Sequence, residues 1–199
     1  CPKSLRKIIK EHDIKCIMPV HWCGNAGDLE EICAIAKENS IFVVEDAAQA
    51  PDTFYNNKAL GTVGDAGVFS FNEPKNLMTG EGGLILTNNA KIARRARLIR
   101  NHGEAIIEEG DDLKNIVGYN FRMTELHAAI AYIQTLNRKK INNFRSKNYN
   151  YLVNEINKQF SEFLTPQRIT HPESYFSYTA AFRWNKKSLI SRNVFARAL

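Results

Sequence analysis

The chain has 199 residues and the composition of an ordinary soluble globular protein, with 44% hydrophobic and 24% charged residues. No apolar run approaches the roughly 18 residues that a membrane span requires, so composition argues against a membrane protein. The 27 basic and 21 acidic residues give a net charge of +6, and the basic excess lies in "KIARRARLIR" and "LNRKKINNFRSK". Apolar residues recur at helical spacing in the first stretch, so we interpret these segments as solvated helix faces and predict no nucleic-acid partner.

The cysteines and the N-terminal residues indicate the compartment. The first fifteen residues lack the apolar core of a secretory signal. The four cysteines, Cys1, Cys16, Cys23 and Cys33, form no Cys-x-x-Cys pair, and His21 beside Cys23 lacks further ligands at zinc-binding spacing. We therefore expect reduced thiols, no metal site and a cytoplasmic protein.

The first half of the chain alternates helical and strand patterns. Helices are predicted at residues 4–12 and 28–39, the second with Asp28 as its N-cap. Nearly continuous apolar runs, which are typical of strands buried on both faces, predict strands at 14–20, 41–45, 67–71 and 83–87. This alternation indicates an α/β architecture with a largely parallel sheet.

The second half is mostly helical. A helix at 89–100 is followed by an acidic, glycine-containing stretch at 101–118 that reads as an exposed loop. A long helical pattern begins after Thr124, its predicted N-cap, and is expected to break near Asn137 because it exceeds the usual helix length. An alternating pattern at 175–184 predicts a strand, and Ser191 is the predicted cap of a final helix.

Candidate functional residues follow the predicted strands, where α/β proteins place their sites. Asp46 ends "IFVVED", and "GVFSFNEPKNLMTGEGG" carries Ser70 and then Lys75 into a turn before a glycine run. Asp46 is either a turn cap or a functional anion, and Lys75 is either a surface charge or a nucleophile. Pyridoxal phosphate (PLP) needs a lysine that bonds it and a carboxylate that keeps its ring nitrogen protonated. The residues alone thus give a candidate PLP site and leave aldolase-type lysine chemistry open.

Four stretches of the sequence carry a resemblance to a known family. "VVEDAAQA", "GDAGVFSFNEPKNLMTGEGGLILTNN", "RLIRNHG" and "GYNFRMTELHAAIA" together resemble the DegT/DnrJ/EryC1/StrS family of PLP-dependent sugar aminotransferases. The similarity covers residues 14–135 and is weaker beyond them. It implies the aspartate-aminotransferase-like fold type I of PLP-dependent transferases, with an incomplete large domain. Residues 1–136 would then belong to the large PLP-binding domain, and 137–199 to a linker helix and the start of the small C-terminal domain.

The resemblance also implies roles for individual residues. Lys75 matches the catalytic lysine that bonds the cofactor, and Asp46 matches the aspartate that pairs with the pyridine nitrogen. Gln49 matches a glutamine that lies against the ring near its phenolic oxygen, and Ser70 matches a serine that bonds the cofactor phosphate. Asn120 matches an asparagine that reaches the phosphate in the neighbouring subunit, so the expected assembly is a homodimer with shared active sites.

The implied reaction moves an amino group from an amino acid, glutamate being the expected donor, to a keto group of a nucleotide-linked sugar, as in polysaccharide biosynthesis. Three alternatives remain: a fold-only relative with a regulatory or binding role, a lysine-bearing sugar dehydratase, and a cyclitol aminotransferase. Family members are longer and carry an upstream phosphate-binding loop and a ring-stacking aromatic residue that are not found here. We therefore expect residues 1–199 alone to be inactive and to bind PLP weakly.

Overall fold

The computed structural model describes residues 1–104, 116–170, 175, 177–185 and 190–198. The helices are α1 (Pro2–Glu11), α2 (Leu29–Glu38), α3 (Ala90–Arg100), α4 (Glu125–Leu136), α5 (Arg138–Gln159) and α6 (Arg192–Ala198), with a 3-10 turn, η1 (Trp22–Gly24). The strands are β1 (Cys16–Ile17), β2 (Phe42–Asp46), β3 (Phe54–Tyr55), β4 (Lys58–Ala59), β5 (Ala66–Ser70), β6 (Gly83–Leu86), β7 (Leu164–Pro166) and β8 (Phe182–Trp184).

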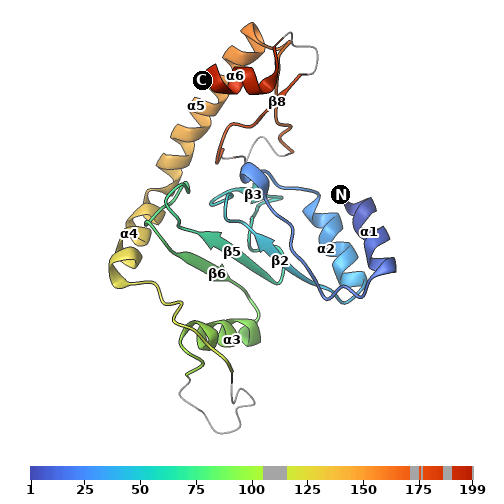
Figure 1. Cartoon of the computed structure of the whole chain (residues 1–199). Coiled ribbons are helices and arrows are strands. Elements are labelled where there is room, and N and C mark those ends of the chain that lie inside the picture. The colour runs from blue at the N-terminus through green and yellow to red at the C-terminus, as the bar shows by residue number, and fades with distance from the viewer. Residues whose placement is uncertain (105–115, 171–174, 176, 186–189, 199) are drawn as a thin grey trace.

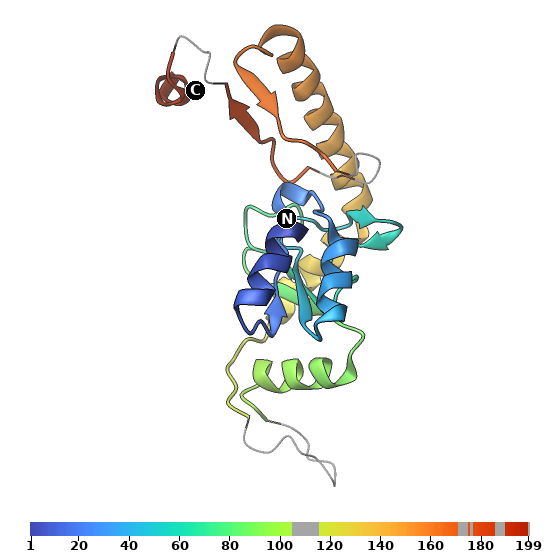
Figure 2. The same cartoon turned by 90° about the vertical axis from the view of Figure 1, so that its right-hand side faces the viewer.

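The central sheet has the strand order β1-β2-β5-β6. The β1–β2 and β2–β5 pairs are parallel, whereas β6 pairs with β5 in the antiparallel sense. Helices α1 and α2 pack against each other, and α2 packs on β2 (Figure 1 and Figure 2). The predicted α/β architecture with a largely parallel sheet is therefore confirmed, with one antiparallel strand at its edge.

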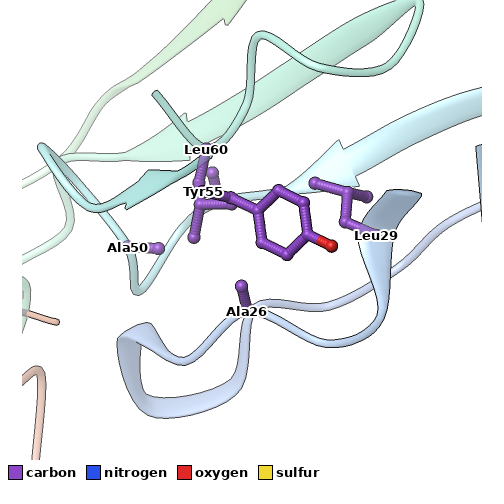
Figure 3. Close-up of a cluster of buried hydrophobic side chains, with 6 residues drawn as sticks. Ala26, Leu29, Ala50, Tyr55 and Leu60 are labelled. Atoms are coloured by element: carbon purple, nitrogen blue, oxygen red, sulfur yellow. The ribbon is translucent and has the colours of Figure 1, made fainter. Parts of the chain in front are cut away.

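Two clusters of buried apolar side chains hold the sheet to α2. In the larger one, Tyr55 and Leu60 from the β3–β4 region meet Ala26, Leu29, Ala47 and Ala50 (Figure 3). Leu29 is fully buried and Leu60 is 1% exposed. Ala47 and Ala50 belong to this cluster and lie on either side of Gln49, so the cluster fixes the chain that follows Asp46, the last residue of β2.

A long helix connects the sheet to a smaller unit. Helix α5 runs from the end of α4 to the β7–β8 hairpin, and α6 lies beside this hairpin (Figure 1). The predicted break falls at Asn137, between α4 and α5. The predicted caps are also present: Thr124 Oγ1 accepts from His127 N, and Ser191 Oγ accepts from Val194 N.

Several sequence predictions are wrong in extent or burial. The strand predicted at 14–20 is reduced to Cys16–Ile17, and Cys16, Met18 and Val20 are exposed. All four residues of β6 are exposed as well. Strand side chains point above and below the sheet, so the exposure of these residues means that the faces of β1 and β6 that carry them are not covered by other side chains. The strand predicted at 175–184 is limited to Phe182–Trp184 among the described residues.

Two further expectations need comment. Asp28 occupies the N-cap position of α2, but its side chain makes no capping hydrogen bond. Most of the acidic stretch predicted as a loop, residues 105–115, lies outside the described residues. None of the helices in the described ranges is both long enough and apolar enough to cross a membrane.

Candidate active site

The carboxyl ends of β2 and β5 form the centre of the candidate site. The two strands are parallel neighbours, and Asp46, the last residue of β2, is paired in register with Val68 of β5. Ser70 ends β5 two residues later, and Gln49 follows β2 closely. Parallel strands end at the same edge of a sheet, so the structure brings these three predicted residues to one edge. Lys75 lies in the turn that leaves β5 at this edge.

Asp46 is held firmly at the end of its strand. Its backbone N–H donates to Pro19 O at 2.9 Å, and its carbonyl accepts from His21 N at 3.0 Å. Its Oδ1 accepts from Ala48 N at 3.0 Å. The turn-capping interpretation of Asp46 is thus correct, and it involves one carboxylate oxygen only. A functional role for the other oxygen is compatible with this turn.

Gln49 is anchored to a strained turn. Its Oε1 accepts from Cys23 N at 2.7 Å. Cys23 has a φ of 55°, in the left-handed region that non-glycine residues seldom adopt. Backbone strain of this kind persists where surrounding contacts enforce it, and here the Gln49 oxygen is one such contact. Because the oxygen is engaged with Cys23, the group that Gln49 offers to a ligand is its N–H donor.

The lysine turn is tied at both ends. Phe71 N donates to Gly82 O at 2.9 Å, and Thr79 N donates to Phe71 O at 2.8 Å. Inside this connection, Lys75 N donates to Asn72 O at 3.0 Å. Gly82 has a φ of 147°, and a Cβ there would lie 2.6 Å from Met123 Cε. Glycine at position 82 therefore leaves room for the Met123 side chain, which belongs to the segment before α4.

Ser70 is placed directly before this turn. Its Oγ accepts from Asn72 N at 3.3 Å, and its side chain is partly exposed. A hydroxyl can donate one hydrogen bond while it accepts another, so Ser70 retains a donor for an anion. The Lys75 amino group lies 5.1 Å from the ring centroid of Tyr178, which comes from the smaller unit.

Asn120 does not join this edge within one chain. It forms an isolated antiparallel bridge with Asn101, which follows α3, and it is exposed. Its predicted role toward a neighbouring subunit stays a prediction. Arg122 Nη1 donates to Asn101 Oδ1 at 2.6 Å, so the segment before α4 is attached to the end of α3.

A buried carboxylate next to Asp46 was not assigned a role from the sequence. Glu45 is fully buried, and its two oxygens take four hydrogen bonds. Oε2 accepts from Gly61 N at 2.7 Å and lies 2.9 Å from His21 Nε2. Oε1 accepts from Val63 N at 2.6 Å and Gly64 N at 2.7 Å. His21, considered above as a metal ligand, is therefore the partner of this carboxylate.

The charge of Glu45 is set by these partners. Burial alone would raise the pKa of the Glu45 carboxyl, because it disfavours the charged form. The hydrogen bonds from the His21 ring and from the three backbone N–H groups outweigh burial and hold this pKa below its usual value. Glu45 is thus an anion whose role is to fix the loop at 61–64 and the η1 turn around β2.

One face of α5 was also missed. Its polar side chains contact two separate segments: Arg138 Nε donates to Asp52 Oδ1 at 3.0 Å, and Asn142 Nδ2 donates to Pro51 O at 3.1 Å. Three residues further along, Arg145 Nε donates to Ser177 O at 3.0 Å. These residues recur at spacings of four and three, which places them on one side of the helix. That polar periodicity was visible in the sequence but was interpreted as a solvated face.

The described residues contain no group of three or more histidine, cysteine, aspartate or glutamate side chains that could hold a metal ion. The four cysteines are free thiols in the structure. Burial raises the pKa of the Cys23 thiol, which disfavours the thiolate form.

Comparison with known proteins identifies the family. A profile of the DegT/DnrJ/EryC1/StrS aminotransferase family matches residues 1–199, and the chain belongs to this family. It is 35% identical over 160 residues to an uncharacterized protein of Methanocaldococcus jannaschii, a match that covers 76% of this chain and 41% of that protein. It is 38% identical over 146 residues to the GDP-perosamine synthase of Escherichia coli, a match that covers 70% and 40% of the two chains.

A solved structure shows the same fold. GDP-4-keto-6-deoxymannose-3-dehydratase with a trapped PLP-glutamate geminal diamine superposes with a TM-score of 0.83 and 25% identity, covering 99% of this chain and 54% of that one. The predicted fold class and the predicted cofactor of the family are confirmed by this similarity. The matched region amounts to between two fifths and just over half of the length of these proteins.

Proposed function

We propose that the protein containing this chain is a PLP-dependent aminotransferase that acts on a keto group of a nucleotide-linked sugar. The observation that carries the proposal is the placement of Asp46 and Ser70 at one sheet edge, from which the Lys75 turn departs. An amine, a carboxylate and a hydroxyl donor gathered there match the three chemical demands of PLP: its aldehyde, its ring nitrogen and its phosphate.

Each residue has a distinct task in this proposal. Lys75 would hold the cofactor covalently through its amine, at the aldehyde carbon. Asp46 holds a proton at the pyridine nitrogen through the oxygen that the Ala48 turn does not use. Gln49 donates from its amide nitrogen to the phenolic oxygen, and Ser70 donates to the phosphate. When bound, PLP supplies a ring that accepts the electrons of a deprotonated carbon.

Lys75 also moves protons. Its amine would take the proton from the α-carbon of the amino donor and would give it back later in the amino transfer. The amino acid leaves as a 2-oxo acid, and the reverse sequence converts the keto sugar into an amino sugar, so no outside oxidant or reductant is required. Glutamate is the proposed donor, supported by the PLP-glutamate adduct trapped in the similar dehydratase.

A second copy of the chain is part of the proposal. Helix α4 leaves a series of apolar side chains exposed, among them Leu126 at 79%, Tyr132 at 66% and Leu136 at 60%. Large exposed apolar side chains gathered on one helix indicate an interaction site. We propose that a homodimer covers it and that Asn120 of one copy reaches the cofactor phosphate of the other.

A dehydratase is the second candidate, because the similar solved structure has that activity. Amino transfer is favoured by the lysine at position 75, because its amine could hold the cofactor covalently and could move a proton during the transfer. The two reactions differ in stoichiometry. Amino transfer yields one amino sugar for each 2-oxo acid formed, whereas dehydration removes a hydroxyl group from the sugar and leaves no nitrogen in it.

Covalent trapping tests the proposed function. The complete natural polypeptide is incubated with PLP and reduced with borohydride, and peptide mass mapping is expected to place the pyridoxyl group on Lys75. Lys75→Arg should show no label, because a guanidinium does not condense with the aldehyde. The matched control is Lys91→Arg at the exposed start of α3, which should keep the label at Lys75. A pyridoxyl group on another lysine of the active protein would contradict the assignment.

A further inference from the structure

The Lys75 side chain contacts an aromatic ring from the distant C-terminal part of the chain. Its amino group lies 5.1 Å from the Tyr178 ring centroid, within the range of a cation–π interaction. Both side chains are partly buried, so the contact is only partly screened by water. None of the residues assigned to the site from the sequence lies beyond Asn120, and Tyr178 extends the site into the smaller unit.

Tyr178 is held by its backbone rather than by chance packing. Arg145 of α5 donates from Nε to Ser177 O at 3.0 Å and from Nη2 to Tyr178 O. The guanidinium is a planar fork of donors, and here it fixes two successive carbonyl groups at once. A rotation of the backbone at Tyr178 would disturb both hydrogen bonds from Arg145.

The carbonyl group of Ser177 also accepts a hydrogen bond from the lysine turn. Asn76, the neighbour of Lys75, donates from Nδ2 to Ser177 O at 3.4 Å. Asn76 is buried at 6% exposure, and its Oδ1 has no hydrogen-bond partner in the structure. A buried polar atom without a hydrogen-bond partner costs free energy. The surrounding contacts must therefore hold the Asn76 side chain in this position. Ser177 O thus joins α5 to the lysine turn.

The segment is anchored once more at Tyr175. Its ring packs edge-on against Tyr149 of α5 at 5.4 Å between centroids, and its carbonyl accepts from Ser146 Oγ at 3.4 Å. Its hydroxyl accepts from Gln167 Nε2 at 2.7 Å. Burial, more than any other cause, raises the pKa of Tyr175 to about 12, so this anchor stays neutral over the physiological range.

We propose that Tyr178 is a positioning residue for Lys75: its ring face receives the lysine amino group, and Arg145 holds the ring in place. This inference rests on the proposed function, since the amino group of Lys75 must remain at the site after the amino donor has displaced it. The ring attracts the ammonium form and covers it, so that the released lysine stays near the carbon to which it returns a proton. The interaction uses the ring face and does not need the tyrosine hydroxyl.

The test measures the reactivity of Lys75 without any cofactor. The complete polypeptide is stripped of PLP and treated with a small neutral amine-acetylating ester, and acetylation of each lysine is followed by peptide mass spectrometry. Tyr178→Leu removes the ring face, which uncovers the amino group and frees it from the cation–π contact. Acetylation of Lys75 should become about two- to fivefold faster, the equivalent of about 0.5–1 kcal/mol. Arg145→Met should act in the same direction, because it frees the two carbonyls.

The controls separate positioning from general loosening. Tyr178→Phe keeps the ring face and should match the wild type at Lys75. Acetylation of Lys91, which lies on α3, should be equal in all variants, and thermal unfolding should report similar stability for the Phe and Leu variants. In the loaded enzyme, Tyr178→Leu should lower kcat with little change in KM, and Tyr178→Phe should restore it.

The outcomes are distinguishable from a failure of the proposed function. Equal acetylation of Lys75 in the wild type and in Tyr178→Leu overturns the inference, and so does a Tyr178→Phe variant that behaves like Tyr178→Leu. If PLP trapping instead misses Lys75 while the acetylation pattern is as expected, the contact stands and the role assigned to it in amino transfer falls.

Discussion

Asp46→Asn is expected to lower the rate of amino transfer about 30- to 900-fold, the equivalent of about 2–4 kcal/mol for a lost charge-assisted contact. The substitution is selective, because asparagine keeps Oδ1, which accepts from Ala48 N, and removes only the negative charge. The neutral amide no longer favours a proton on the pyridine nitrogen. The measurement is kcat for formation of the 2-oxo acid from the amino donor, together with cofactor content from absorption.

The control for this variant is Asp52→Asn, a substitution of the same chemistry close by in the chain. Asp52 accepts from Arg138 Nε at 3.0 Å and is not proposed to touch the cofactor. The Asp52→Asn variant should change the rate of amino transfer little. If Asp46→Asn turns over at nearly the wild-type rate while it retains cofactor, Asp46 is a turn cap and nothing more.

Glu45→Gln is expected to destabilise the fold by about 3–5 kcal/mol, as is usual when one partner of a buried ionic group is removed. The glutamine nitrogen can only donate, and the three backbone groups that the carboxylate oxygens now satisfy, on Gly61, Val63 and Gly64, are fixed donors. At least one backbone N–H would therefore face another donor. Urea unfolding followed by circular dichroism gives the free energy of unfolding for comparison with the wild type.

The matched control is Glu31→Gln at an exposed position of α2, where the carboxylate makes a distant 3.9 Å ion pair with Arg6. It should change the free energy of unfolding by less than about 0.5 kcal/mol. A Glu45→Gln protein within about 1 kcal/mol of the wild type would show that the four hydrogen bonds do not organise this region.

The depressed pKa of Glu45 also sets the pH dependence of stability. The unfolded-state pKa of a glutamate is about 4.3, and the folded-state pKa lies below it. The contribution of Glu45 is thus fully present above the unfolded value and is lost as pH falls through the lower, folded value. The wild type should lose stability with acid in this window, and Glu45→Gln should show a shallower loss there.

Local patterns predicted the strand ends of the site. Asp46, Ser70 and Lys75 were found because each interrupts or follows an apolar strand, and that signal is contained in a few neighbouring residues. Gln49 has no such signal, since "DAAQA" reads equally well as a plain turn, and its role came from the family resemblance alone. The structure shows a Gln49 hydrogen bond to the backbone of Cys23, a residue of a different segment.

What the sequence could not predict depends on contacts between distant segments. The patterns of α5 showed that polar residues share one face, but not that Arg145 meets Ser177 or that Tyr178 meets Lys75. Hydropathy likewise predicted burial for residues 14–20 without specifying a neighbour. Burial of a strand side chain needs a second surface packed over that face of the sheet, and Met18 and Val20 remain 59% and 52% exposed.

The antiparallel pairing of β5 with β6 restricts how this protein can vary in length. Ser70 pairs with Gly83, so the segment between them is a closed loop whose ends cannot separate. An insertion in a surface loop usually costs little free energy, because loop-closure entropy rises slowly with length. Between Asn72 and Lys75, where Glu73 and Pro74 are exposed, an added residue would by contrast shift Lys75 relative to Ser70 and Asp46 and leave the hydrogen bonds of Phe71 with Thr79 and Gly82 in place. Natural or engineered length variants at this point of the loop are therefore expected to fold normally and to lose amino-transfer activity.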